Sequence, residues 1–288
     1  MLVRIGSRGS RLALVQAEQA ATYLRGPGIE VAFVPITTAG DLDRKRPFGE
    51  IGARGVFVKE IEEALLAGRI DVAVHSAKDM TSTDTAGLVV GAYLERDDPR
   101  DALVGAATIR PEMRIGTASA RRKAQLLALE PSLRIEPMRG NVETRLRKLR
   151  ERGLDAIVLA ACGLDRLGLE REIGARLDPA QMLPEAAQGA LALQVRTGEE
   201  ELVAGADHAE TRRRVEPERA FVATIGAGCL APVAAHHDGA RLRAMIAAED
   251  GSWVENGSGD DPVALAERLS ERAAARDETG TQPAQTRA

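Results

Sequence analysis

The chain is poor in cysteine and contains no long apolar run. Its two cysteines, Cys162 and Cys229, stand in unlike surroundings, so the sequence offers neither a disulfide framework nor the repeated spacing of a cysteine metal site. No stretch approaches the roughly 18 to 20 apolar residues of a membrane helix, and the N-terminus lacks the apolar run of a signal peptide. We therefore expect a protein of the reducing cytoplasm with no membrane association.

An excess of positive charge is also missing. The formal net charge is -4 and the isoelectric point is near 5.8, whereas a nucleic-acid-binding domain is expected to be strongly basic. The lysines and arginines must therefore be judged by where they cluster. A metal site is not expected either, because His236 and His237 alternate on a predicted strand without further ligands beside them. With 288 residues, the chain is long enough for two or three domains that have their own cores.

The segment 71–79 (DVAVHSAKD) joins an apolar strand pattern to a group of polar residues. Residues 72–74 are typical of a strand that is buried on both faces of a parallel sheet. Lys78 and Asp79 then lie beyond the carboxyl end of this strand, where open α/β sheets bind their ligands. An ordinary strand-end turn with a surface Lys-Asp pair has the same local pattern, so the choice between the two depends on the rest of the chain.

A strand, a polar loop and a helix follow one another twice along the chain. The first copy has a strand at 2–5, a turn rich in glycine and hydroxyl groups, and a helix over 12–24; the second copy begins about 110 residues later. The motif RIGS at 4–7 matches RIGT at 114–117. Chance similarity between two short βα units is the alternative interpretation. A true repeat predicts two similar α/β lobes with a cleft between them.

The remaining segments connect the two copies and extend beyond them. The charged, proline-containing segment 94–101 predicts a linker or hinge, and an apolar strand at 190–195 is interpreted as a return to the first lobe. From residue 210 the pattern changes to a helix, a glycine-rich loop, short strands and a helix over 262–275, which predicts a small α+β domain. The tail from about 276 is low in apolar residues and is expected to be disordered. The predicted domains are 1–95 with 190–207, 96–189, and 208–288.

Cationic residues collect at strand-to-helix turns in both copies. Arg121 and Arg122 stand in the first turn of a helix, where the macrodipole disfavours a cation by about 0.3 to 1 kcal/mol. A pair placed against this preference is understandable if the arginines and the helix amides share an anion, and arginine suits carboxylates. Solvated surface arginines are the alternative for each residue taken singly. Together the set predicts a cleft for an anionic ligand: Arg8, Arg11, Arg121, Arg122, Arg139 and Arg145.

Asp79 is the one carboxylate expected among these cations. A carboxylate can stabilise a cationic intermediate or exchange a proton with it, provided that it faces the ligand. Cys229 lies in the glycine-rich loop 226–232, which permits close approach of a bulky group. A small buried hydrophobic residue is the alternative for Cys229, and Cys162, at the end of an apolar run, is expected to belong to the core.

Eight motifs, in order over nearly the whole chain, resemble the porphobilinogen deaminase family, also called the hydroxymethylbilane synthases. They are GSRGSRLAL (6–14), GVFVKEIEEALL (55–66), DVAVHSAKD (71–79), IGTASARRKAQL (115–126), RGNVETRL (139–146), AACGLDRLG (160–168), LPEAAQGAL (183–191) and GAGCLAP (226–232). The resemblance implies an α/β fold with two similar lobes like those of type II periplasmic binding proteins, and a small C-terminal α+β domain. It also implies a transferase that condenses four porphobilinogen molecules head to tail, with release of ammonia, into the linear tetrapyrrole hydroxymethylbilane of haem biosynthesis.

The resemblance assigns roles to residues as well. Asp79 is implied to be the catalytic aspartate, which stabilises the azafulvene-type cation left when ammonia departs, and Cys229 to hold a dipyrromethane cofactor through a thioether. Each pyrrole carries acetate and propionate groups, which is consistent with an arginine-lined cleft in an acidic protein. The implied binding residues, in which Arg54 stands where the family often has lysine, are Arg8, Ser10, Arg54, Lys78, Ser119, Arg121, Arg122, Arg139, Arg145, Arg166 and Gln188.

A non-catalytic anion-binding module is the alternative function, since two lobes and a basic cleft also describe transport receptors. Such a module offers no use for Cys229, and the sequence shows no export signal. We therefore expect a monomeric cytoplasmic enzyme that uses the small molecule porphobilinogen as its substrate and binds neither a metal nor nucleic acid.

Overall fold

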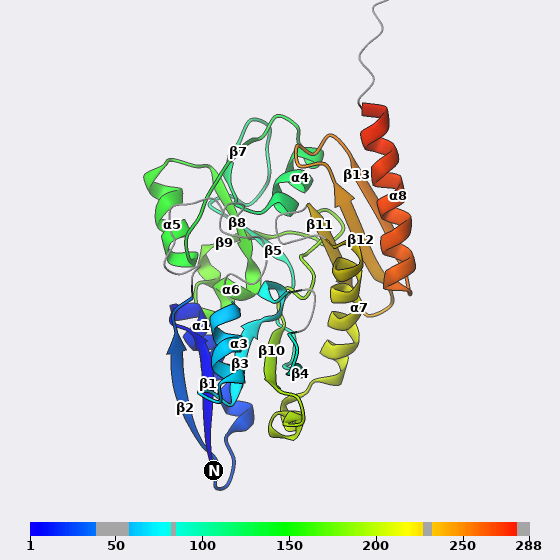
Figure 1. Ribbon diagram of the computed structural model, residues 1–288. Coiled ribbons are helices and arrows are strands. Elements are labelled where there is room, and N and C mark those ends of the chain that lie inside the picture. Colours follow the sequence, from blue (N-terminus) through cyan, green and yellow to red (C-terminus); the bar gives the residue numbers. More distant parts are fainter. Residues whose placement is uncertain (39–57, 82–84, 227–231, 281–288) are drawn as a thin grey trace, which may run out of the picture.

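The computed structural model describes residues 1–38, 58–81, 85–226 and 232–280 of the chain. It has two α/β lobes, one below the other in Figure 1, and a smaller C-terminal unit beside them. This confirms the predicted fold class. No helix among the described residues is both long and apolar enough to cross a membrane.

The first lobe is built on a five-stranded sheet with the order β2-β1-β3-β10-β4. Strands β1, β2 and β3 are parallel, and β10 is antiparallel to both of its neighbours. Ser10 begins the first helix, because its side chain accepts a hydrogen bond from the backbone amide of Ala13. The strands and helices are β1 (Leu2–Arg8), α1 (Arg11–Leu24), β2 (Glu30–Ile36), α3 (Lys59–Leu66), β3 (Val72–Ser76), η2 (Ala77–Asp79), β4 (Leu88–Tyr93) and β10 (Leu191–Arg196).

The second lobe has a sheet of the same design, with the order β7-β6-β8-β5-β9. Its parallel strands β6, β7 and β8 correspond to β1, β2 and β3, and β5 is antiparallel to both of its neighbours, as β10 is in the first lobe. The two similar lobes predicted from the repeat are thus confirmed. The elements are β5 (Asp101–Val104), β6 (Arg114–Gly116), α4 (Ala120–Leu129), β7 (Arg134–Glu136), α5 (Val142–Glu151), β8 (Ala156–Ala160), α6 (Ala161–Arg166), η3 (Glu170–Glu172) and β9 (Ile173–Arg176).

The chain passes between the lobes twice. Residues 94–100 lead from β4 to β5, and residues 177–190 lead back from β9 to β10. Because β10 lies between β3 and β4, the first sheet contains a strand that follows the whole second lobe in the sequence. The two crossing segments therefore lie where the lobes meet.

The C-terminal unit packs two helices against an antiparallel sheet, β11-β12-β13. The strand β13 was not predicted, since its sequence VENGSG has little apolar character. Helix α8 runs to Gly280, beyond the predicted end at 275, and so corrects the predicted start of a disordered tail; alanine and arginine, which dominate residues 273–276, are good helix formers. The remaining elements are η4 (Glu200–Leu202), η5 (Ala204–Ala206), α7 (Ala209–Ile225), β11 (Val233–His237), β12 (Leu242–Ala247), β13 (Val254–Gly259) and α8 (Pro262–Gly280).

Glu218, on α7, joins the C-terminal unit to both crossing segments. Its buried carboxylate accepts two hydrogen bonds from Arg96 (2.7 and 3.0 Å) and one from the backbone amide of Ala187 (2.6 Å). It also accepts from the amide of His237 on β11 (2.7 Å). Burial alone would favour the protonated acid, but the Arg96 guanidinium and the nearby His236 lower the pKa of Glu218 to about 2.

Candidate functional site

Asp79 stands at the end of a short 3₁₀ turn that directly follows a buried strand. Strand β3 is buried from Val72 to His75, and η2 then carries Lys78 and Asp79 beyond its carboxyl end. The change from apolar to polar residues at the end of this strand predicted this placement. A pocket opens against the first lobe here, and its polar border is formed by Arg8, Ser10, Gln16, His75, Ser76 and Asp79.

The surroundings of Asp79 change the pKa of its side chain. The side chain can be reached by solvent, yet it lies deep among protein atoms, and this removal from bulk water raises the pKa of Asp79. The charge of Lys78 opposes this shift, that of Glu185 adds to it, and Arg8 and Arg145 oppose it more weakly. Asp79 is therefore a solvent-accessible carboxylate with both positive and negative groups around it.

Arg145 brings a cation near Asp79 from the second lobe. The helix that carries it, α5, begins at Asn141, whose side chain accepts from the amide of Thr144 (2.9 Å), and the Arg145 side chain donates to the carbonyl of Gly140 (2.7 Å). Burial, together with the like charges of Arg122 and Arg139, lowers the pKa of Arg145 to about 10. Like charges held this close together are a typical preparation for an anionic ligand.

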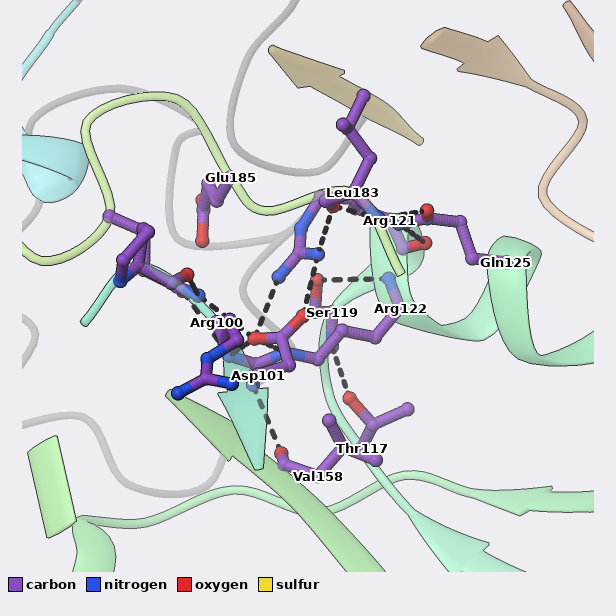
Figure 2. Close-up of polar contacts among 12 residues, drawn as sticks. Arg100, Asp101, Thr117, Ser119, Arg121, Arg122, Gln125, Val158, Leu183 and Glu185 are labelled. Carbon is purple, nitrogen blue, oxygen red and sulfur yellow. Dashed lines mark hydrogen bonds and ion pairs between the residues drawn. The ribbon is translucent and has the colours of Figure 1, made fainter. Parts of the chain in front are cut away.

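Arg121 and Arg122 do share an anion, but that anion belongs to the protein. Both side chains are nearly inaccessible, 2% and 6% exposed, and both donate to the fully buried carboxylate of Asp101 at the start of β5 (Figure 2). Arg121 donates in addition to the carbonyl of Leu183 (2.7 Å), and Arg122 to that of Val158 (3.0 Å). The two arginines therefore tie α4 to β5 and β8 within the second lobe, and Arg121 also ties it to the second crossing segment.

Gln188 connects the Asp101 cluster to Lys78 in the first lobe. Its side-chain amide group donates to Asp101 (3.0 Å) and to the carbonyl of Pro99 (2.7 Å), while its oxygen accepts from Lys78 Nζ (3.0 Å). Every one of these hydrogen bonds joins residues far apart in the sequence. Gln188 thus lies where the lobes meet, next to Lys78 and Asp79.

The other predicted binding residues are more scattered. Arg166 is largely buried and bonds Asp97 (2.7 Å) and the carbonyl of Gly189 (2.7 Å), which places it at the two crossing segments. Ser119 caps helix α4 by accepting from the amide of Arg122 (3.3 Å), as Ser10 caps α1. Each hydroxyl can still donate its own hydrogen. Cys229 and Arg54 lie outside the described residues.

Two carboxylates near the cations were missed by the sequence interpretation, which had Asp79 as the only one. Asp101 opens the apolar strand DALV, and a charge at the start of a buried strand was a usable signal. Glu185 lies in the second crossing segment, 3.7 Å from Lys78 Nζ, with its side chain 28% exposed. No periodic pattern marks Glu185, because the segment that carries it belongs to neither a helix nor a strand. We use the name interlobe site for Arg8, Lys78, Asp79, Arg139, Arg145, Glu185 and Gln188.

The sequence matches two family descriptions over most of its length. Residues 3–204 match "Porphobilinogen deaminase, dipyromethane cofactor binding domain" and residues 212–276 match "Porphobilinogen deaminase, C-terminal domain". The porphobilinogen deaminase of Roseiflexus sp. (strain RS-1) is 47% identical over 278 residues, which cover 91% of this chain and 92% of that protein. The porphobilinogen deaminase of Syntrophotalea carbinolica is 45% identical over 281 residues, covering 93% and 89% respectively.

Among solved structures, a TRAP periplasmic solute binding protein from Desulfovibrio salexigens matches with a TM-score of 0.44 and 9% sequence identity, over 72% of each chain. The sequence matches are far closer than this structural one. They extend through both lobes and the C-terminal unit, and they include the segments that form the interlobe site. The chain belongs to the porphobilinogen deaminase family.

Proposed function

We propose that the protein is a hydroxymethylbilane synthase. It condenses four porphobilinogen molecules head to tail, releases an ammonia at each step and forms the linear tetrapyrrole hydroxymethylbilane. The observation that carries this proposal, beyond family membership, is the charge distribution of the interlobe site. Lys78, Arg8 and Arg145 lie near a solvent-accessible carboxylate whose pKa is raised, Asp79, and Arg139 adds its charge beside Arg145. Such a site can bind an acidic substrate and stabilise a cation formed from it.

A dipyrromethane fits this set of donors. Each of its two pyrroles carries an acetate and a propionate, and the charges of Arg8 from the first lobe and Arg145 from the second both act on Asp79, which supports a convergence of positive charge from the two lobes here. We propose that Arg8, Ser10, Arg54, Lys78, Ser119, Arg139, Arg145, Arg166 and Gln188 hold these acids, and that Arg121 and Arg122 support them mainly through the Asp101 cluster. The cofactor, attached through a thioether to Cys229, supplies when bound the free pyrrole position at which chain growth begins.

Asp79 is proposed to act in the chemical step. When the carbon–nitrogen bond of porphobilinogen breaks, the electron pair leaves with ammonia and the pyrrole becomes cationic. The ionised Asp79 carboxylate stabilises this developing charge more than it stabilises the bound substrate, which is what lowers the barrier. Lys78, held by Gln188, and the arginines meanwhile position the substrate's acid groups.

The remaining features follow from this function. We propose a cytoplasmic monomer with domains 1–95 plus 190–207, 96–189 and 208–288, acting on a small molecule and not on nucleic acid or membranes. A purely anion-binding module is not favoured, since the relatives at 45 to 47% identity carry the name of an enzyme.

The mass of the purified protein tests the proposal. We expect it to exceed the sequence mass by one dipyrromethane and the protein to consume porphobilinogen with release of ammonia. Cys229→Ser should lose the added mass, because the thioether sulfur is gone. Cys162→Ser is the matched control and should keep it, since Cys162 is buried in α6 and burial raises the pKa of its thiol, so that little nucleophilic thiolate is present. A fully active protein with the unmodified sequence mass would contradict the proposal.

A further inference from the structure

Glu185 is a carboxylate of the interlobe site, and none of the roles proposed so far involves it. It lies three residues before Gln188 in the second crossing segment, and Figure 2 draws it beside the Arg121–Asp101 cluster. Its negative charge contributes to the raised pKa values of both Asp79 and Arg121. Glu185 is therefore close to the reacting carboxylate and to the second lobe at once.

The Glu185 carboxylate can accept further hydrogen bonds. Its contact with Lys78 Nζ is 3.7 Å, longer than a hydrogen bond, whereas Lys78 donates to Gln188 at 3.0 Å. Within the described part of the chain, the Glu185 side chain accepts no hydrogen bond. Asp101 and Glu218 differ from Glu185 in burial and in hydrogen bonding, because each is fully buried and accepts several short hydrogen bonds. Glu185 thus keeps a solvent-facing carboxylate next to Asp79.

The chemistry of the substrate gives this carboxylate a role. Porphobilinogen carries two carboxylates and one aminomethyl group, which is an ammonium ion at neutral pH. Arg8, Arg139 and Arg145 suit the two acids but repel the ammonium. The substrate therefore needs a negative group at its aminomethyl end before the reaction starts, and charged pairs of this kind fix orientation as well as affinity.

We propose that Glu185 is a specificity-determining residue that receives the aminomethyl ammonium of the incoming porphobilinogen. This inference rests on the proposed function and divides the work between two carboxylates. Glu185 orients the substrate in the ground state, and Asp79 acts as the carbon–nitrogen bond breaks. Two carboxylates in unlike environments commonly take unlike roles. Replacing Glu185 should therefore weaken substrate binding, whereas replacing Asp79 should lower kcat.

The test compares porphobilinogen with an analogue that has a methyl group in place of the aminomethyl group. For cofactor-loaded Glu185→Gln we expect KM for porphobilinogen to rise about tenfold with a smaller change in kcat, the scale of one charge-assisted hydrogen bond at a partly exposed site. The analogue has no ammonium, so its inhibition constant should stay within about twofold of the wild-type value. Tight binding of the analogue also shows that the variant is folded. Glu185→Asp, which keeps the charge, should recover most of the lost affinity.

Glu172→Gln is the control, because Glu172 is also on the second lobe, is 34% exposed and pairs with Arg150 (3.1 Å) away from the interlobe site. Glu172→Gln should leave the KM for porphobilinogen and the inhibition constant of the analogue unchanged. If Glu185→Gln weakens the analogue as much as porphobilinogen, Glu185 acts through Lys78 on the acid groups and the inference is wrong. An unchanged KM for porphobilinogen would overturn it too. Wild-type protein that does not convert porphobilinogen would instead refute the proposed function, before any variant is compared.

Discussion

Asp79→Asn is expected to lower kcat by about 10²-fold or more, the scale seen when one electrostatic or acid–base group is removed from an active site. The amide keeps the shape of the side chain but cannot stabilise the cation that forms as ammonia leaves. KM should change little, because the cation that Asp79 stabilises has not yet formed in the bound substrate. Asp79→Glu keeps the charge and should retain more activity than Asp79→Asn.

Single-turnover release of ammonia from cofactor-loaded protein measures this step directly. The wild-type rate should fall at low pH as Asp79 takes up a proton, with a midpoint above that of an ordinary aspartate because its pKa is raised. The Asn variant should lack this acid limb. Release of the first ammonia at the wild-type rate by the Asn variant would reduce Asp79 to a structural residue.

Asp101→Asn is expected to lower the free energy of unfolding by about 3 to 5 kcal/mol, because it leaves two buried guanidinium groups without their shared counter-ion. The side chains of Arg121 and Arg122 are 2% and 6% exposed, so water cannot replace the lost carboxylate. Urea unfolding of the wild-type and variant proteins measures the difference. Cofactor attachment should suffer as well, since Gln188 and the crossing segments lose a common anchor.

Asp98→Asn provides the matched control. Asp98 also pairs with two arginines, Arg100 and Arg176, but it is 20% exposed, and exposed pairs typically contribute only about 0 to 1 kcal/mol. The double variant Asp101→Asn with Arg121→Met should be less unstable than the sum of its single changes, because it removes part of the uncompensated charge. An Asp101→Asn protein as stable as the Asp98→Asn control would contradict our account of the cluster.

The sequence predicted the structure best where the residues that decide it are close together in the chain. The apolar run 72–74 followed by polar residues predicted β3 and the position of Asp79 at its carboxyl end. The predicted helix over 12–24 corresponds to α1, which begins one residue earlier, at Arg11. The apolar strand predicted at 190–195 is likewise β10, Leu191–Arg196. In each case the residues that decide the structure lie within one element, so their pattern can be read without knowledge of the fold.

The sequence did not predict the contacts that depend on how the chain crosses between the two lobes. The position of Arg121 and Arg122 at a helix start was evident, but their anion, Asp101, lies about 20 residues earlier. The sequence interpretation had placed Asp101 at the end of the linker 94–101, whereas it is the first residue of β5. Glu185 reaches Lys78 from more than 100 residues away along a segment without periodic structure. Pairings of this kind arise from tertiary structure, which no local pattern records.

The interleaved sheets also determine the order in which the lobes can form during synthesis. Strand β4 is joined to β3 through β10, and about 100 residues separate β4 from β10 in the chain, so the ribosome needs roughly 5 to 20 s to supply the missing strand. All five strands of the second sheet emerge within that interval. The second lobe is therefore able to fold first on the nascent chain, while the open edges of β3 and β4 are exposed to chaperones until β10 is inserted between them.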